Sequence, residues 1–379
     1  MPQTRPVSPT TSDSVSASPA ASSATLSASA ALSPTTPASP RAPSPAASAS
    51  TASAAPAPAA PAPLGRPGRV LRFVSVAACV PYLALKVAWI SGSRPGIPDG
   101  SPLLDHRALM IFANGLTVLM DAAVIVLALL LTCPWGLRTP AWLLAAPMWA
   151  ATGLLLPIVA GFPLTQLAGV FDGGGSAGSG GPAEPFLHEW VFGVVYVGFI
   201  VQGLALGALF VRYARARWSH AWRGRVGDLP PGPGRGARTA AVTAAVLALL
   251  PVTLHLLWAC GSTTGLAPSR ARDLTQDARI LEALSALYPA LAVTGALLLA
   301  FRWGRALPVG VPLALGWLGS GAVACWGGWL LLGSLTAIGD AMNRPTGAML
   351  LTYAVQMIIG AIVAVLGTRF LRQRAGSIA

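Results

Sequence analysis

The hydrophobic pattern of the chain consists of eight long apolar runs separated by short polar or glycine-rich segments. Each run has about 20 residues or more, which at about 1.5 Å per residue is enough for a helix to cross a hydrocarbon core of about 30 Å. In lipid such runs must be helical, because every backbone N–H and C=O group needs a partner within the segment. The sequence therefore predicts an all-α membrane protein with transmembrane helices near residues 69–92, 108–132, 140–161, 188–212, 239–260, 281–301, 308–333 and 346–369.

The composition supports this assignment and affects how the net positive charge of the chain is interpreted. Of the 379 residues, 54% are hydrophobic and only 10% are charged, which is far too apolar for an ordinary soluble domain. The formal net charge of +13 would fit a nucleic-acid-binding protein only if the basic residues clustered on a soluble face. Here they lie between the apolar runs, so the charge indicates membrane topology, and we expect no nucleic-acid partner.

The arginines predict which side of the membrane each connecting segment faces, because Lys and Arg are retained on the cytoplasmic side. With the N-terminus inside, eighteen arginines fall in cytoplasmic segments and six fall in outer loops. We therefore expect a multi-pass protein of the plasma membrane with both the N-terminus and the C-terminus in the cytoplasm.

The chain divides into a tail, two membrane units and a linker. Residues 1–65 are almost all Ala, Ser, Pro and Thr and offer little to bury, which predicts a disordered cytoplasmic tail. This tail is interpreted either as a docking segment or as dispensable. Residues 66–217 and 239–379 each hold four predicted helices, and 218–238 is a basic cytoplasmic linker. The outer segment 172–181 is rich in Gly and Ser, which is typical of a flexible linker.

Residues recur between the two four-helix units at a nearly constant offset. The pattern Trp-x-x-Gly-Ser starts at Trp89 and again at Trp258, 169 residues later. The pattern Trp-x-x-x-Gly starts at Trp149 and again at Trp317, 168 residues later. We interpret this as a 4+4 internal repeat in which both halves face the same way, because each has an even number of spans. Chance alignment of Leu- and Ala-rich helices is the alternative.

Ionisable residues inside the predicted spans are few. Lys86, the only lysine of the chain, falls in the first span, whereas Asn114 and Asp121 fall in the second. Steps of four and three lead from Tyr82 through Lys86 to Trp89, which places these residues on one helical face. Because consecutive antiparallel helices pack together, we expect Lys86 and Asp121 to be partners.

The repeat extends this polar group to the second half of the chain. Lys86 corresponds to His255 and Asn114 to Glu282, so each half has a basic residue on its first helix and a polar partner on its second. Ionisable groups inside a membrane are usually paired and often functional. We therefore predict a binding or proton-coupling site formed by Lys86, Asn114, Asp121, His255 and Glu282. An interhelical clamp that only fixes packing is the alternative. The secondary candidates are Tyr82, Trp89, Gln202 and Trp258.

Several classes of active site are missing from the sequence. There is no His pair within the spans to hold a haem, and there is no HExxH, Walker A or GxSxG motif. The four cysteines lie far apart without a CxxC pair, so no metal site is predicted. We expect no cofactor and assign no catalytic residue, although an enzyme built around Lys86, Asp121, His255 and Glu282 stays open.

Three segments resemble a family of uncharacterised actinobacterial multi-spanning membrane proteins. They are VPYLALKVAWISGS at 80–93, GIPDGS at 96–101 and NGLTVLMDA at 114–122. The resemblance covers the first three predicted helices best. It implies a location in the plasma membrane and supplies no catalytic or binding residues.

The sequence leaves three functions open. The first is a proton-linked transporter of an unidentified small solute or ion, with its site between the repeated halves. This rests partly on fold-level analogy. The second is a membrane scaffold or sensor whose polar residues are structural. The third is a lipid-modifying enzyme, which requires an outer cleft that holds Lys86, His255 and Glu282 together. The lipid bilayer is the one partner that composition predicts, and no oligomeric state is predicted.

Overall fold

The computed structural model describes residues 65–99, 107–171, 187–229, 234–334 and 344–376. Within these residues the chain is all-helical, apart from one isolated β-bridge, and eight of its helices are long and apolar enough to cross a membrane. The predicted fold class is thus confirmed. The predicted tail, up to residue 64, and the predicted linker at 172–181 lie outside the described residues.

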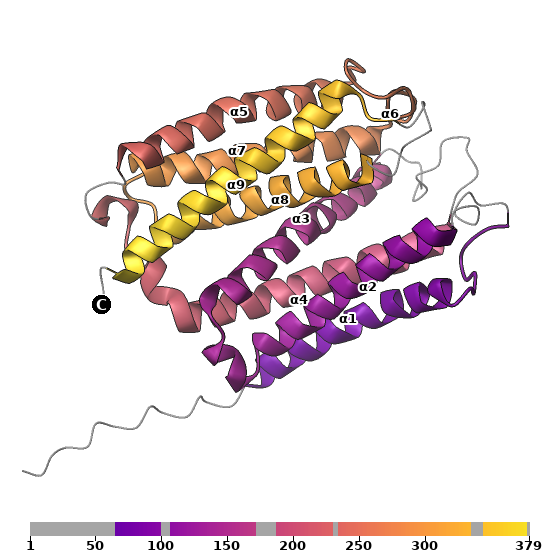
Figure 1. The fold of residues 1–379 in the computed structure, drawn as a ribbon, viewed down its shortest axis with the longest axis horizontal. Coiled ribbons are helices and arrows are strands. Elements are labelled where there is room, and N and C mark those ends of the chain that lie inside the picture. The colour runs from indigo at the N-terminus through magenta and orange to yellow at the C-terminus, as the bar shows by residue number, and fades with distance from the viewer. Residues whose placement is uncertain (1–64, 100–106, 172–186, 230–233, 335–343, 377–379) are drawn as a thin grey trace, which may run out of the picture. The chain divides into compact units, whose positions relative to one another are not determined.

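The eight long helices follow the predicted order along the chain (Figure 1). A short helix, α6 (Pro268–Arg272), lies in the segment between the fifth and the sixth of them. The long helices are α1 (Arg66–Ile90), α2 (Arg107–Leu130), α3 (Ala141–Phe171), α4 (Glu189–Trp222), α5 (Arg235–Ala259), α7 (Gln276–Phe301), α8 (Gly310–Ser334) and α9 (Gly347–Gly376).

Three helices run well past their predicted C-terminal ends. The helix α3 continues ten residues beyond residue 161, α4 ten beyond residue 212, and α9 seven beyond residue 369. For α4 and α9 the prediction counted only the apolar run that spans hydrocarbon, whereas the added residues 162–171 of α3 are themselves largely apolar. A helix can continue into the polar interface, and the last three turns of α4 do so with Arg215 and Arg217. Arg217 holds this extension in place by donating to the carbonyl oxygens of Gly136 and Thr139.

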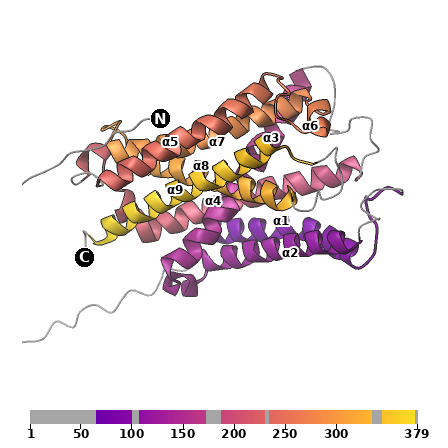
Figure 2. The same cartoon turned by 45° about the horizontal axis from the view of Figure 1, so that its top comes forward.

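The two four-helix units share most of their helix contacts but differ at one pair, because α8 packs extensively on α7 whereas α3 touches α2 only slightly. In the first unit α1 contacts α2 and α4, and α4 contacts α3. In the second, α5 contacts α7 and α9, while α8 contacts both α7 and α9. The two units meet chiefly where α3 packs against α8, as Figures 1 and 2 show.

The two ends of the bundle, here called the loop end and the terminal end, carry different parts of the chain. The loop end carries the segments 91–99 and 260–275, which follow α1 and α5. The terminal end carries the first residues of α1 and α5 and the last residues of α9.

The segments that follow α1 and α5 have the same backbone design. Gly92 and Gly261 have φ of 98° and 93°, a left-handed conformation that suits glycine. The amides of Gly92 and Gly261 donate to the carbonyl oxygens of Trp89 and Trp258. The amides of the next residues, Ser93 and Ser262, donate to the carbonyl oxygens of Ala88 and Leu257. This is a Schellman ending, in which the amides after the helix satisfy its last carbonyls. The repeated Trp-x-x-Gly-Ser pattern therefore has a local structural meaning.

The two tryptophans close these loops in the same way. The indole Nε1 of Trp89 donates to the carbonyl oxygen of Pro95 at 2.8 Å, and that of Trp258 donates to the carbonyl oxygen of Thr264 at 2.9 Å. In both cases the acceptor lies six positions after the donor in the sequence. Both tryptophans are buried. Each indole thus fastens the outgoing loop onto the end of its own helix.

Candidate functional site

The second unit contains a closed polar network near the loop end. His255 of α5 and Glu282 of α7 are joined by a contact of 2.5 Å between Nδ1 and Oε2. The amide Nε2 of Gln356, on α9, lies 2.9 Å from His255 Nε2. Arg270 of α6 donates to the other oxygen of Glu282 at 3.4 Å. Four elements of the unit are therefore tied together by side chains.

The hydrogen bonds of this network fix the tautomer of His255. With its amide oriented as in the structure, Gln356 donates from Nε2, so His255 Nε2 accepts. The imidazole proton then sits on Nδ1 and is donated to Glu282. The Trp258 ring packs edge-on against the imidazole, with centroids 5.1 Å apart. His255, Glu282 and Gln356 are all buried, whereas the Arg270 side chain is 53% exposed. The network thus runs from the surface to the interior.

The first unit contains a different arrangement, centred on Asp121 of α2. This side chain is 3% exposed, and its Oδ1 accepts a hydrogen bond of 3.2 Å from Nε2 of Gln202 on α4. Its Oδ2 is fully buried and has no hydrogen-bond partner in the described part of the chain. The hydroxyl of Ser75 on α1 is likewise buried without a partner. Buried polar groups are nearly always satisfied, so a carboxylate oxygen left unpaired requires an explanation.

The predicted partnership of Lys86 with Asp121 is not a salt bridge, because no such contact joins them among the described residues, although the two charges interact electrostatically. The Lys86 ammonium instead lies over two aromatic rings of its own helix, 4.8 Å from the centroid of Tyr82 and 4.7 Å from that of Trp89. The negative face of an aromatic ring attracts a cation, and the effect grows when water is excluded. Lys86 lies one turn from the end of α1, whereas Asp121 lies near the middle of α2. That difference in depth explains the missing contact.

The remaining predicted residues lie in or beside these groups. Asn114 is buried on α2, as expected, and Tyr82 is buried against Phe199 of α4 with ring centroids 4.8 Å apart. Gln202, a secondary candidate, is the direct partner of Asp121. The structure therefore brings His255 together with Glu282, and Asp121 together with Gln202. The Lys86 ammonium lies over the rings of Tyr82 and Trp89, outside both of these groups.

Sequence reasoning did not include Arg270 and Gln356 in the site. Arg270 was counted only as a loop charge, and no periodic pattern connects a loop residue to a side chain twelve positions further on. Gln356 is a single amide within the predicted span at 346–369. An amide in hydrocarbon needs a partner, which is the signal that identifies it as part of a network.

Two surface grooves are lined by described residues, and neither is lined by the polar groups above. One lies on the outer face of α5, between Arg238 and Leu247. The other lies between α1 and α4 near Pro95 and Trp190. Within the described residues, no group of three or more His, Cys, Asp or Glu side chains is placed to hold a metal ion. Comparison of the chain with family models, with curated proteins and with solved structures found no match.

Proposed function

We propose that the protein is a proton-linked transporter of a small solute or ion in the plasma membrane, and that Asp121 is the group that takes up and releases the proton. The observation that carries this proposal is the unpaired, fully buried Oδ2 of Asp121. Uptake of a proton would remove the negative charge that the carboxylate otherwise holds in the buried interior. Carboxylates within membrane spans are commonly members of proton relays and ion pathways.

The packing around Asp121 supports a role in movement rather than in fixing the bundle. Gln202 supplies one neutral hydrogen bond to the carboxylate, and the helices α2 and α4 that carry the pair have little other contact. By contrast, a structural clamp would use both oxygens, as Glu282 does with His255 and Arg270. The Asp121–Gln202 pair can therefore open at a lower cost than the network of the second unit.

We further propose that residues 66–217 and 239–379 are the duplicated halves of the transporter. The matching Schellman endings and indole hydrogen bonds after α1 and α5 support this proposal. So does the contact between α3 and α8, which correspond in the duplication. Gly153 of α3 abuts Gly321 of α8, its own counterpart 168 residues later. Contact between equivalent positions is expected where a two-fold axis passes, and such an axis along the membrane normal relates parallel repeats.

In this account the two halves rock against each other about the α3–α8 contact. At Gly153 and Gly321 backbone meets backbone. Beside them, Trp149 Nε1 of α3 donates to Ser320 Oγ of α8 at 2.9 Å, and Trp326 Nε1 of α8 donates to the carbonyl oxygen of Leu154 at 3.2 Å. The arginine distribution supports an orientation with both termini in the cytoplasm. The loop end would then face outward.

A membrane scaffold or sensor is the second candidate, and one observation favours it. The network of His255, Glu282, Gln356 and Arg270 is closed and ties α5, α6, α7 and α9 together. Such a network fits a rigid second half. The third hypothesis, a lipid-modifying enzyme, is not proposed, because Lys86 contacts Tyr82 and Trp89 and takes no part in the His255–Glu282 network.

Proton exchange at Asp121 is tested by infrared difference spectroscopy of the full-length protein in lipid bilayers, between acidic and alkaline buffer. We expect a carbonyl band of a protonated carboxyl group that disappears in Asp121→Asn. The band should persist in the control Asp99→Asn, because Asp99 is an exposed loop carboxylate. Identical spectra for the wild type and Asp121→Asn would remove the support for Asp121 as the proton-coupling group.

A further inference from the structure

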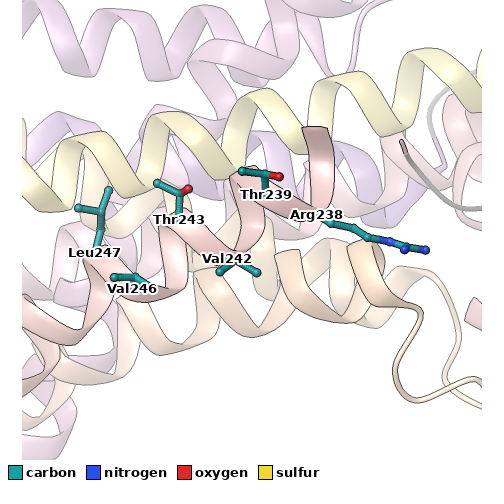
Figure 3. Close-up of a pocket in the computed structure, with 6 residues that line it drawn as sticks. All are labelled: Arg238, Thr239, Val242, Thr243, Val246 and Leu247. Carbon is teal, nitrogen blue, oxygen red and sulfur yellow. The ribbon is translucent and has the colours of Figure 1, made fainter. Parts of the chain in front are cut away.

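The outer face of α5 carries a groove that the proposed transport function does not use (Figure 3). It has a volume of about 470 Å³. Its lining residues are Arg238, Thr239, Val242, Thr243, Val246 and Leu247.

The chemistry of this groove changes along its length. Arg238 and Thr239 lie in the second turn of α5, at the terminal end, and supply a cation and a hydroxyl. Val242, Val246 and Leu247 follow deeper in the helix and supply an apolar floor. From Thr239 to Leu247 the groove rises about 12 Å along the helix axis, at about 1.5 Å per residue. This covers most of one leaflet of a hydrocarbon core about 30 Å thick.

The polar end of the groove lies at the level where lipid headgroups are expected. Trp303 is 56% exposed and stacks on Phe301, with ring centroids 5.1 Å apart. The Arg238 guanidinium lies 5.9 Å from the centroid of the same Phe301 ring. Exposed tryptophans are enriched at the boundary between membrane and water. Arg238 therefore sits at the interface, and the apolar floor faces the hydrocarbon, where Val246 is 60% exposed.

The positive charge at this end is not neutralised within the described part of the protein. Arg238 is exposed and forms no ion pair there. Arg302, directly after Phe301, has two buried guanidinium nitrogens without a hydrogen-bond partner among the described residues. Arg235 adds another exposed cation one turn before Arg238. An anion at the mouth of the groove would be attracted by the exposed Arg235 and Arg238.

We propose that this groove binds an anionic phospholipid of the leaflet at the terminal end. Its phosphate would contact Arg238, its glycerol and ester oxygens would meet the hydroxyls of Thr239 and Thr243, and one acyl chain would lie along Val242, Val246 and Leu247. A free phosphate ion would use only the polar end and would leave the apolar floor unoccupied. The length of the groove and its change from a polar to an apolar lining therefore together favour a lipid over free phosphate.

The binding is tested by native mass spectrometry of the full-length protein in detergent, titrated with phosphatidylglycerol and separately with phosphatidylcholine. We expect Arg238→Gln to weaken the first phosphatidylglycerol-binding event about fivefold, as for the loss of one arginine at a membrane surface. Arg238→Lys should keep most of the affinity. The matched control is Arg215→Gln, which neutralises an exposed terminal-end arginine on α4, outside the groove.

A second variant tests the apolar part of the site independently of its charge. Val246→Trp fills the groove from an exposed position and should weaken phosphatidylglycerol binding without lowering the unfolding temperature. The proposal is overturned if Arg238→Gln binds phosphatidylglycerol like the wild type. It is also overturned if Arg215→Gln loses as much affinity, or if inorganic phosphate displaces the bound lipid.

Discussion

Gly153 of α3 lies directly against Gly321 of α8, so that a Cβ atom on Gly153 would stand 2.2 Å from the carbonyl oxygen of Gly321. The contact is backbone on backbone. Since real Cβ atoms do not approach a carbonyl so closely, even alanine must push the two helices apart. This contact lies in the α3–α8 interface, where the two four-helix units chiefly meet, and it occurs at positions that correspond in the proposed duplication.

Gly153→Ala should therefore destabilise the protein by about 1–3 kcal/mol, which is the usual cost of overpacking. The measurement is the free energy of unfolding in mixed micelles. The matched control is Gly193→Ala on α4, where an added Cβ would meet no atom within 4 Å. Equal effects of the two substitutions would contradict the close α3–α8 contact.

The two indole hydrogen bonds predict matched losses at matched positions. Trp89→Phe and Trp258→Phe each remove the donor to a loop carbonyl, at Pro95 and Thr264, and should each cost about 0.5–1.5 kcal/mol. Thermal unfolding of the single variants measures this loss of stability. Trp142→Phe is the control, because the Trp142 side chain is 67% exposed. A clear loss from one substitution and none from the other would count against equivalent roles for the two loops.

Substitution of Glu282 in the His255–Glu282 network should lower the stability of the protein without abolishing proton coupling. Glu282→Leu leaves His255 Nδ1 and Arg270 without their acceptor and should destabilise the protein by about 1–3 kcal/mol. Glu282→Gln retains an acceptor and should cost less. Both effects are read from unfolding in detergent. Proton movement that vanishes in a well-folded Glu282→Gln variant would show that the network takes part in coupling and is not only structural.

Substitution of Asp121 should have the reverse effect, because it should keep the stability of the protein and abolish proton coupling. Asp121→Asn keeps the size of the side chain and can still accept from Gln202, so the unfolding temperature should change little. Coupled transport should be lost, because an amide does not exchange a proton. Size-exclusion chromatography and thermal unfolding establish the fold of this variant. Complete loss of folded protein would instead identify Asp121 as a structural residue.

Much of the fold was predictable because lipid restricts what the backbone can do. Apolar runs long enough to span had to be helices, and all eight are present among the described residues. Helical periodicity also placed Tyr82 and Trp89 on one face of α1, and both are buried, with Lys86 half-buried between them. The C-terminal ends of α4 and α9 were missed because hydrophobicity stops before the helix does, whereas α3 continues through a further, largely apolar stretch at 162–171.

The details of the site were less predictable, for reasons of tertiary packing. Contacts between consecutive helices can be inferred from connectivity, and His255 does meet Glu282 across α5 and α7. Gln202 and Gln356 reach their partners from helices that are not consecutive with them, so their contacts depend on which helices become neighbours. The Lys86 ammonium contacts the neighbouring rings of Tyr82 and Trp89 and forms no salt bridge with the more distant Asp121 carboxylate, a choice that helix connectivity alone does not predict.

The most direct test of the central claim is proton movement into liposomes that contain the full-length protein and an internal pH-sensitive dye. The solutes added outside should include sugars, amino acids, organic cations, organic anions and inorganic ions. We predict that at least one of them drives proton movement in the wild type and in Asp99→Asn, and that Asp121→Asn shows none. Equal proton movement in the wild type and Asp121→Asn, or none in the wild type with any solute, would contradict the account.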